Sequence, residues 1–202
     1  MQHSLFSLPS GINILPFDGE ALFYPDFLTP QESDNYFNHI LNSFTWTQEQ
    51  IKIYDKEVMQ PRLTAFCGDA YKDLTYAEKV IHPQPWTKEM IELKQRTEIL
   101  SGNKFTNALF NLYRDGKDSV SWHRDNEKNW GKDPVIASVS LGAARTFQLR
   151  NYENKSIMRS VELTPGSLLI MRGVIQRRWE HQVPKTSKRI GGRINITFRT
   201  LV

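Results

Sequence analysis

The sequence is poor in cysteine and contains no long apolar run. Cys67 is the single cysteine among 202 residues, so an intramolecular disulfide and a zinc site of several thiolates are both excluded. No segment approaches the roughly 20 apolar residues of a membrane-spanning helix, and residues 1–11 lack the basic start and apolar run of a secretion signal. We therefore expect an intracellular protein of a reducing compartment without membrane attachment, cytoplasmic in a prokaryote or nuclear in a eukaryote.

A strong charge imbalance and internal repeats are also absent. The net charge of +4 and the isoelectric point near 9.1 favour a polyanionic partner only weakly. A chain of 202 residues with 39% hydrophobic content can bury one core. We expect a single domain over 1–202, acting as a monomer, in which the Pro- and Gly-interrupted segment 1–20 is an extended arm.

Two amphipathic helices are predicted in the first half of the chain. The first covers roughly 30–43, because Thr29 can act as its N-cap and apolar residues then recur at helical spacing. The second covers about 87–100, with Thr87 as a cap and Gly102 as a stop. Both are interpreted as structural supports.

After Gly102 the pattern changes to short strands broken by turns. The predicted strands are Ala108–Tyr113, Val135–Leu141, Thr146–Arg150, Met158–Leu163, Ser167–Met171 and Ile194–Thr200. No helical pattern separates the later strands, which argues against a parallel α/β fold. We expect a mainly β fold with supporting α-helices, in which a sheet sandwich or jelly roll carries the helices outside one sheet.

Three residues form a candidate metal site. His123 and Asp125 are two residues apart, so in an extended segment both side chains point to the same side. His181 follows much later and would have to come from a separate strand. Two imidazoles and one carboxylate on one face of an octahedral iron(II) leave positions open for a bidentate 2-oxo acid and dioxygen. By itself the pattern is weak, since His-x-Asp also arises by chance and isolated histidines often serve only in packing.

The C-terminal strand carries a polar face that contains two arginines. Its members at period two are Arg193, Asn195, Thr197 and Arg199, while the residues between them are apolar. Arginines beside an apolar core are costly unless an anion binds there, and arginine suits the two carboxylates of a small diacid. The alternative is an edge strand whose arginines are solvated.

Several motifs occur in register between about Gln60 and the C-terminus. They are Asn111-Leu112-Tyr113-Arg114-Asp115-Gly116, His123-Arg124-Asp125, Ile136-Ala137-Ser138-Val139-Ser140-Leu141-Gly142, Arg145-Thr146-Phe147, Gly166-Ser167-Leu168-Leu169 and the Arg-x-Asn-x-Thr-x-Arg ending. Together they resemble the AlkB family of 2-oxoglutarate- and iron(II)-dependent dioxygenases. The resemblance implies a double-stranded β-helix (jelly-roll) core over about 105–202 and a nucleotide-recognition lid over about 60–85.

The resemblance also implies the roles of individual residues. The iron ligands would be His123, Asp125 and His181. The residues that bind 2-oxoglutarate would be Asn111, Tyr113, Arg193, Asn195, Thr197 and Arg199. Arg193 matches a catalytic position near the iron and the C1 end of the cosubstrate, and Arg199 matches the partner of the distal carboxylate.

The implied reaction is oxidative dealkylation of N-alkylated nucleobases such as 1-methyladenine and 3-methylcytosine in DNA, with RNA as a further substrate. Iron(II) would be the cofactor, 2-oxoglutarate and dioxygen would be consumed, succinate and formaldehyde would be released, and the biological role would be repair of alkylation damage. A base must leave the duplex to reach the metal. Candidate substrate contacts are Arg62, Tyr76, Glu127 and Arg145, with Arg124 and Trp122 as further candidates.

Some features leave the substrate open. Trp122 is interpreted as a sheet-packing residue rather than a base contact, because alternation puts it opposite His123. Glu127 has a surface turn acid as its competing interpretation. Glu78 and Asn126 depart from the family pattern and weaken any transfer of substrate preference. The alternatives are an oxygenase of the same fold acting on a tRNA base or a protein side chain, and an inactive nucleic-acid-binding module.

Overall fold

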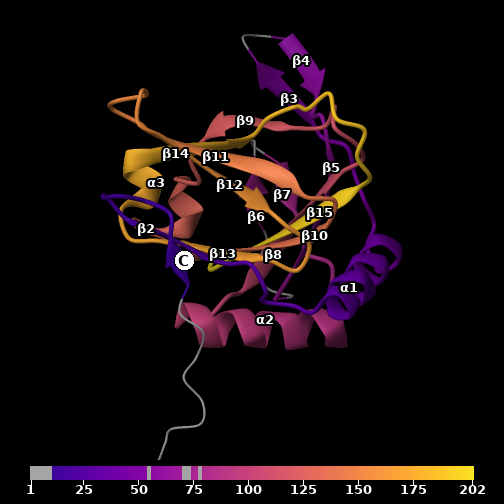
Figure 1. Ribbon diagram of the computed structural model, residues 1–202. Helices are drawn as coiled ribbons and strands as arrows, with labels where there is room; N and C mark the ends of the chain where they lie inside the picture. The colour runs from indigo at the N-terminus through magenta and orange to yellow at the C-terminus, as the bar shows by residue number, and fades with distance from the viewer. Residues whose placement is uncertain (1–10, 54–55, 70–73, 77–78) are drawn as a thin grey trace, which may run out of the picture.

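Two antiparallel sheets face each other in the computed structural model (Figure 1), which describes residues 11–53, 56–69, 74–76 and 79–202. The larger sheet has the strand order β1 (Ile12–Asn13), β2 (Glu20–Tyr24), β13 (Leu168–Arg172), β10 (Ile136–Gly142), β15 (Arg193–Arg199), β8 (Asn107–Tyr113) and β5 (Leu63–Gly68). The smaller sheet has the order β12 (Met158–Leu163), β11 (Arg145–Asn151), β14 (Trp179–Val183) and β9 (Val120–His123). Two hairpins, β3 (Gln50–Ile53) with β4 (Lys56–Met59) and β6 (Leu74–Tyr76) with β7 (Lys79–Ile81), stand apart from both sheets.

The two long helices begin and end where their capping residues predict. Helix α1 spans Pro30–Ser43, and Thr29 forms a full capping box with Glu32. Helix α2 spans Lys88–Ser101; the Thr87 hydroxyl accepts a hydrogen bond from the Met90 N–H, and Gly102 ends the helix at a φ of 67°. A left-handed residue at this position closes the helix at little cost only when it is glycine. Both predicted helices are therefore confirmed within one residue at each end.

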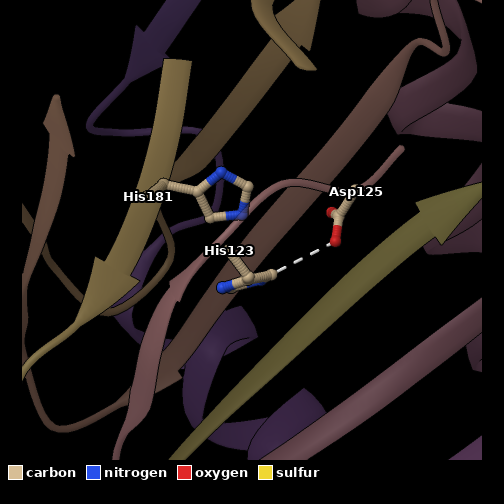
Figure 2. Close-up of side chains that lie close together, drawn as sticks. All are labelled: His123, Asp125 and His181. Atoms are coloured by element: carbon tan, nitrogen blue, oxygen red, sulfur yellow. Dashed lines mark ion pairs between the residues drawn. The ribbon is translucent and has the colours of Figure 1, made fainter. Parts of the chain in front are cut away.

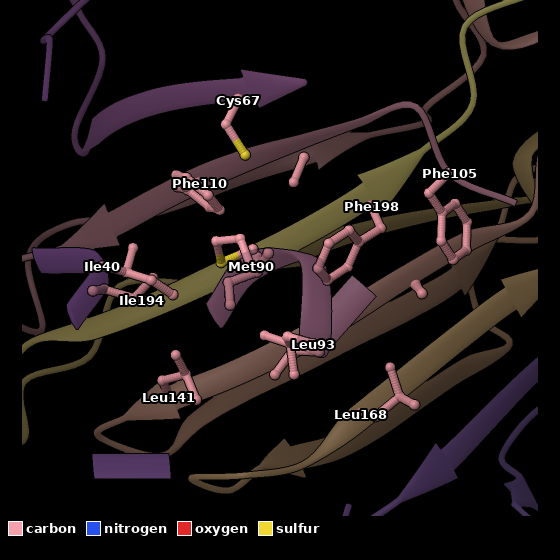
Figure 3. Close-up of a cluster of buried hydrophobic side chains, with 14 of the residues drawn as sticks. Ile40, Cys67, Met90, Leu93, Phe105, Phe110, Leu141, Leu168, Ile194 and Phe198 are labelled. Atoms are coloured by element: carbon pink, nitrogen blue, oxygen red, sulfur yellow. The ribbon is translucent and has the colours of Figure 1, made fainter. Parts of the chain in front are cut away.

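An outer core joins these helices to the larger sheet. Strand β15 contributes its apolar alternate residues, all fully buried: Ile194, Ile196 and Phe198. They pack with Met90 and Leu93 of α2 (Figure 3), and Cys67 lies in the same cluster. Because one face of β15 is used here, its polar face must point toward the smaller sheet.

An inner core fills part of the space between the two sheets. Leu169 and Met171 of the larger sheet pack with Phe147, Leu149 and Trp179 of the smaller sheet. This core closes one end of the sandwich and leaves the remainder of the interior to polar side chains. The expected mainly β fold, with helices packed outside one sheet of a jelly roll, is confirmed.

Several strands lie where the sequence pattern predicted none. Strand β2 adds the end of the predicted arm to the larger sheet by pairing with β13. Strand β5 pairs with β8 as an edge strand, so the segment interpreted as a lid includes part of the larger sheet. Strands β9 and β14 are short and carry the candidate metal ligands. No helix among the described residues is long and apolar enough to cross a membrane.

Candidate active site

The three candidate metal ligands meet at the end of the smaller sheet (Figure 2). His123 ends β9 and lies directly opposite His181 of β14, with 4.3 Å between the two ring centroids. Asp125 follows two residues later, and its Oδ1 is 3.7 Å from Nε2 of His123. One nitrogen or oxygen atom from each of the three residues lies within 4.8 Å of the others. The pairing of β9 with β14 thus brings together ligands that are far apart in the sequence.

Two of the three candidate ligands are held by neighbouring groups, whereas the buried Nδ1 of His181 has no hydrogen-bond partner among the described residues. His123 Nδ1 is 2.8 Å from the Ser121 carbonyl oxygen, a contact in which Nδ1 donates and Nε2 keeps its lone pair for a metal. The Asp125 N–H donates to Gln176 Oε1 at 3.0 Å, from helix α3 (Ile175–Arg178). The first contact orients the His123 ring, and the second fixes the backbone at Asp125.

The protonation states also suit metal binding. Burial, followed by the nearby His123, lowers the pKa of His181 to about 3, so its imidazole is neutral and can act as a ligand. Burial opposes ionisation of Asp125, but the Arg199 guanidinium and the two imidazoles hold the pKa of its carboxyl group below the ordinary value. A neutral imidazole at His181 and an ionised carboxylate at Asp125 fit iron(II).

Arg193 is a buried cation with free donors. It is 1% exposed, and one of its N–H groups donates to Ser140 Oγ at 2.9 Å. Its Nε and Nη1 have no hydrogen-bond partner within the part of the chain that the structure describes. Burial lowers the pKa of Arg193 to about 10, which leaves it charged at neutral pH. A buried charged group with unused donors fits an anionic ligand.

Arg199 lies at the metal end of the same strand. Its Nη2 donates to Asp125 Oδ2 at 2.7 Å, and the side chain is buried. The predicted assignment had put Arg193 near the iron and Arg199 at the distal carboxylate of the cosubstrate. Arg199 contacts the ligand shell, while Arg193, six residues away along β15, points to the interior beside Tyr113. Alternation along a strand shows which residues share a face but not which end of the strand meets the metal.

The other predicted cosubstrate residues line the same interior. Tyr113 pairs with Arg193 and Asn111 with Asn195 across β8 and β15. Thr197 Oγ1 donates to Asn195 Oδ1 at 3.0 Å. Asn111, Tyr113, Asn195 and Thr197 line one cavity of about 580 Å³. The candidate metal ligands and both arginines line the same cavity, whose size is typical of small-molecule sites.

Arg62 and Glu127, two of the four predicted substrate contacts, lie at this cavity. Arg62 Nε donates to Asn111 Oδ1 at 2.7 Å. Tyr76 belongs to β6, but its side chain is outside what the structure describes, and Glu78 lies outside the described residues altogether.

Arg145 does not occupy a position from which it can bind a nucleic acid. It is 3% exposed and donates to the carbonyl oxygens of Asp115, Asp118 and Pro184. These contacts connect the loop after β8 to the chain after β14, which is a structural role. The placement corrects the interpretation of Arg145 as a substrate contact.

Trp122 and Arg124 lie at the rim of the cavity. The Arg150 guanidinium carbon is 4.0 Å from the centroid of the Trp122 ring, and that of Arg124 is 3.8 Å from the Tyr152 ring. Trp122 therefore packs against Arg150, as expected for a residue that packs on the sheet. It also borders the cavity.

Other residues of the site were missed from the sequence. Ser138 and Ser140 of β10 hold Asn195 and Arg193, and their period-two spacing opposite the arginine strand could have identified them. Gln176 and Trp130 come from short helical turns. No periodic pattern marks such residues in advance.

Two facing sheets that enclose two imidazoles, a carboxylate and buried arginines define a class, the jelly-roll oxygenases that use a non-haem metal and an anionic cosubstrate. A family model described as 2OG-Fe(II) oxygenase superfamily matches residues 20–199. The human alpha-ketoglutarate-dependent dioxygenase alkB homolog 3 is 38% identical over 96% of this chain and 68% of its own length. The DNA oxidative demethylase ALKBH2 of Arabidopsis thaliana is 31% identical over 91% of this chain and 67% of its own length.

A solved structure supports the fold. The structure of OsALKBH1 matches 89% of this chain and 97% of that chain with a TM-score of 0.65 at 16% identity. The chain belongs to the AlkB family within the 2OG-Fe(II) oxygenase superfamily. It is a dioxygenase dependent on iron(II) and 2-oxoglutarate, and it spans about two thirds of the length of the human and Arabidopsis relatives.

Proposed function

We propose that the protein removes alkyl groups oxidatively from nucleobases of DNA and RNA, with 1-methyladenine and 3-methylcytosine as representative substrates. The convergence of His123, Asp125 and His181 beside a cavity lined by two buried arginines carries this proposal. The names of two relatives, a dioxygenase and a DNA oxidative demethylase, support the substrate class.

We assign the iron to His123, Asp125 and His181. Bound iron supplies the oxidative chemistry that hydroxylates an N-alkyl carbon, after which the product loses formaldehyde. These three residues would hold the ion and would leave its remaining positions to the cosubstrate and dioxygen. The remaining task of the protein is to orient the cosubstrate and substrate, which needs no nucleophile and no general base.

The arrangement of the arginines gives 2-oxoglutarate one direction in the cavity. Its keto acid end must face the ligands, so Arg199 beside Asp125 belongs to that end. Its distal carboxylate then points along β15 to Arg193, where two N–H donors and the Tyr113 ring are available. Pairing of a carboxylate with a buried guanidinium gives both affinity and direction.

The substrate base would occupy the part of the cavity beyond the metal. The base has to be flipped from a duplex or already be unpaired. Glu127 lines the cavity, and a carboxylate near the base would favour cationic bases such as 1-methyladenine and 3-methylcytosine. Arg62, Trp122 and Arg124 border the cavity and are candidates for contacts with the neighbouring backbone or bases.

We further propose that 1–202 acts as one monomeric catalytic domain, with a recognition lid over about 60–85 and a catalytic core over about 105–202. The lid assignment rests on the resemblance of this segment to the nucleotide-recognition lid of the AlkB family. The net charge of +4 is compatible with a nucleic acid partner. An intracellular reducing compartment is proposed from the single cysteine.

The test is a comparison of substrates under identical conditions. The protein with iron(II), ascorbate and 2-oxoglutarate is offered methylated single- and double-stranded DNA and RNA, and succinate and formaldehyde are measured. Formaldehyde that appears in proportion to succinate supports the proposal. Succinate without demethylation would assign another substrate, such as a tRNA base or a protein side chain. Neither product, with binding retained, would indicate a binding module.

A further inference from the structure

Trp130 is a buried tryptophan at the edge of the active site. It ends the 3-10 turn Lys128–Trp130 and is 6% exposed. One side of the ring packs with Phe66 and Leu201 in a small apolar cluster. The residue also borders the active-site cavity, so it touches two environments, one structural and one catalytic.

The polar and charged contacts of Trp130 connect two parts of the site. Its Nε1 donates to Glu127 Oε2 at 2.9 Å. The guanidinium carbon of Arg199 is 5.1 Å from the centroid of its ring. Arg199 in turn donates to Asp125 Oδ2. The indole therefore lies between Glu127, which is assigned to the substrate side, and Arg199, which binds the candidate metal ligand Asp125.

The contact with the ring matters because Arg199 is weakly constrained by hydrogen bonds. Its Nε is buried and has no hydrogen-bond partner among the described residues. An aromatic face within about 6 Å of the guanidinium attracts the cation and restricts its rotation. The ring thus helps to keep the Nη2 donor directed at Asp125.

The direction of Arg199 decides how Asp125 can bind a metal. The carboxylate has two oxygens, and Arg199 holds Oδ2. The other oxygen, Oδ1, faces His123 Nε2 at 3.7 Å. When Arg199 stays in place, one oxygen of Asp125 is presented to the metal and the second is engaged. Chelation by both oxygens would consume a coordination position that the cosubstrate or dioxygen needs.

We infer that Trp130 is a positioning residue that orients Arg199 and Asp125 for the metal through its ring and orients Glu127 for the substrate base through its indole N–H. The second half of this assignment rests on the proposed function, whereas the first half concerns the metal site alone. A role in packing alone would instead make every Trp130 variant act through stability.

Two variants separate the two contacts. Trp130→Phe keeps an aromatic face below Arg199 and removes the N–H donor. Trp130→Leu removes both and keeps an apolar side chain in the cluster with Phe66 and Leu201. Trp86→Phe is the matched control, because Trp86 Nε1 donates to Asp69 Oδ1 at 3.0 Å and its ring stacks on Phe198, on the opposite face of the strand that carries Arg199.

The first measurement is binding of cobalt(II) to the metal-free protein by calorimetry, together with thermal unfolding. Loss of an outer contact of a metal ligand typically weakens metal binding about 10- to 100-fold. We expect a weakening of about 10-fold for Trp130→Leu and affinity within about twofold of wild type for Trp130→Phe and Trp86→Phe. Wild-type cobalt(II) affinity in a folded Trp130→Leu variant would overturn the metal half of the inference.

The second measurement is turnover of a 1-methyladenine oligonucleotide. Trp130→Phe is expected to raise KM on the order of 10-fold with little change in kcat, because Glu127 loses the hydrogen bond from the indole while the metal site is intact. An unchanged KM would overturn the substrate half, and this arm remains decisive if Trp130→Leu does not fold. Wild-type protein that binds cobalt(II) but leaves the oligonucleotide unchanged would instead refute the proposed substrate.

Discussion

The individual side chains of the site are prepared before any ligand arrives. His123 has its Nδ1 engaged by a carbonyl oxygen, and Asp125 has one oxygen engaged by Arg199. His181 is kept neutral by burial. His123 and Asp125 therefore each offer a defined atom to a metal, which reduces the reorganisation needed on binding.

Replacement of a ligand should separate chemistry from binding. We expect Asp125→Ala and His181→Ala to abolish succinate and formaldehyde production, while affinity for a methylated oligonucleotide stays within about threefold of wild type. The checks are a product assay and a fluorescence-anisotropy titration on the same preparations. Wild-type turnover in either variant would remove that residue from the metal site.

Replacement of the two arginines should have different effects. Arg193→Met should weaken 2-oxoglutarate binding on the order of 100-fold, because the distal carboxylate loses a charged hydrogen-bonding partner. Binding of 2-oxobutyrate, which lacks that carboxylate, should change little. Calorimetry on the cobalt(II) form measures both ligands, with the exposed Arg159→Met as a control.

An equal loss for both 2-oxo acids would refute the assigned direction of the cosubstrate. Arg199→Met, in contrast, should weaken cobalt(II) binding itself, because Asp125 loses its charged partner.

The sequence was sufficient for the identity of these residues and insufficient for their order. Because side chains alternate between the two faces of a strand, the sequence predicted that the arginines of β15 share one face. The same alternation predicted that His123 and Asp125 point to one side of their segment. It could not show that Arg199, rather than Arg193, lies beside Asp125, because that depends on how the two sheets are stacked. Arg145 was misassigned for a similar reason, since its burial comes from loop carbonyls that no local pattern reveals.

Among the secondary-structure elements, helix α2 is joined to the sheet by one acidic residue. Glu98 is 6% exposed and accepts hydrogen bonds from Lys104 and from the Phe105 N–H, which leads into β8; it also pairs with Lys94. Burial opposes its ionisation, but these partners lower the pKa of Glu98 below its usual 4.5. The anchoring contact is thus fully formed at neutral pH.

A folded-state pKa below the unfolded value adds stability above the unfolded pKa, and that stability is lost as the pH falls through the folded value. Glu98→Gln should therefore lower the free energy of unfolding by about 1–2 kcal/mol at pH 7, and the difference from wild type should shrink below about pH 4. Urea unfolding across this range measures the effect. The exposed Glu92→Gln is the control, and a difference that grows on acidification would rule out this role of Glu98.

Elements with local signals were predictable and elements without them were not. The helices carry caps that act within a few residues, so their ends followed from the sequence. Strands β9 and β14 are only four and five residues long, and their position depends on pairing with each other although β10 to β13 lie between them in the chain. Such long-range pairing leaves little trace in local composition.

In the molecule as a whole, the two sheets have separate tasks. The larger sheet supplies the arginines on its inner face and receives the helices on its outer face, and the smaller sheet supplies the two histidines of the candidate metal site. The cavity lies between them and is lined by residues of both sheets. Mutations in the outer core should act on stability, whereas mutations along the inner face should act on ligands.

The net charge makes a prediction for the intact protein. If backbone phosphates contact its basic residues, affinity for an oligonucleotide should fall as salt is raised, with a linear decrease of log affinity against log salt. An anisotropy titration between low and physiological salt measures the slope. Affinity that does not depend on salt would argue against a phosphate-contacting surface.

The proposed function requires that His123, Asp125 and His181 hold one iron(II) beside a 2-oxoglutarate directed by Arg199 and Arg193. This requirement can be tested by an anaerobic titration of the metal-free protein with iron(II) and 2-oxoglutarate, followed by the visible charge-transfer band of the iron and 2-oxo acid chelate. We expect a band that saturates at one equivalent of iron, requires both components and is absent in His181→Ala. A band of undiminished intensity in that variant, or none in the wild type, would show that these residues do not hold the ion.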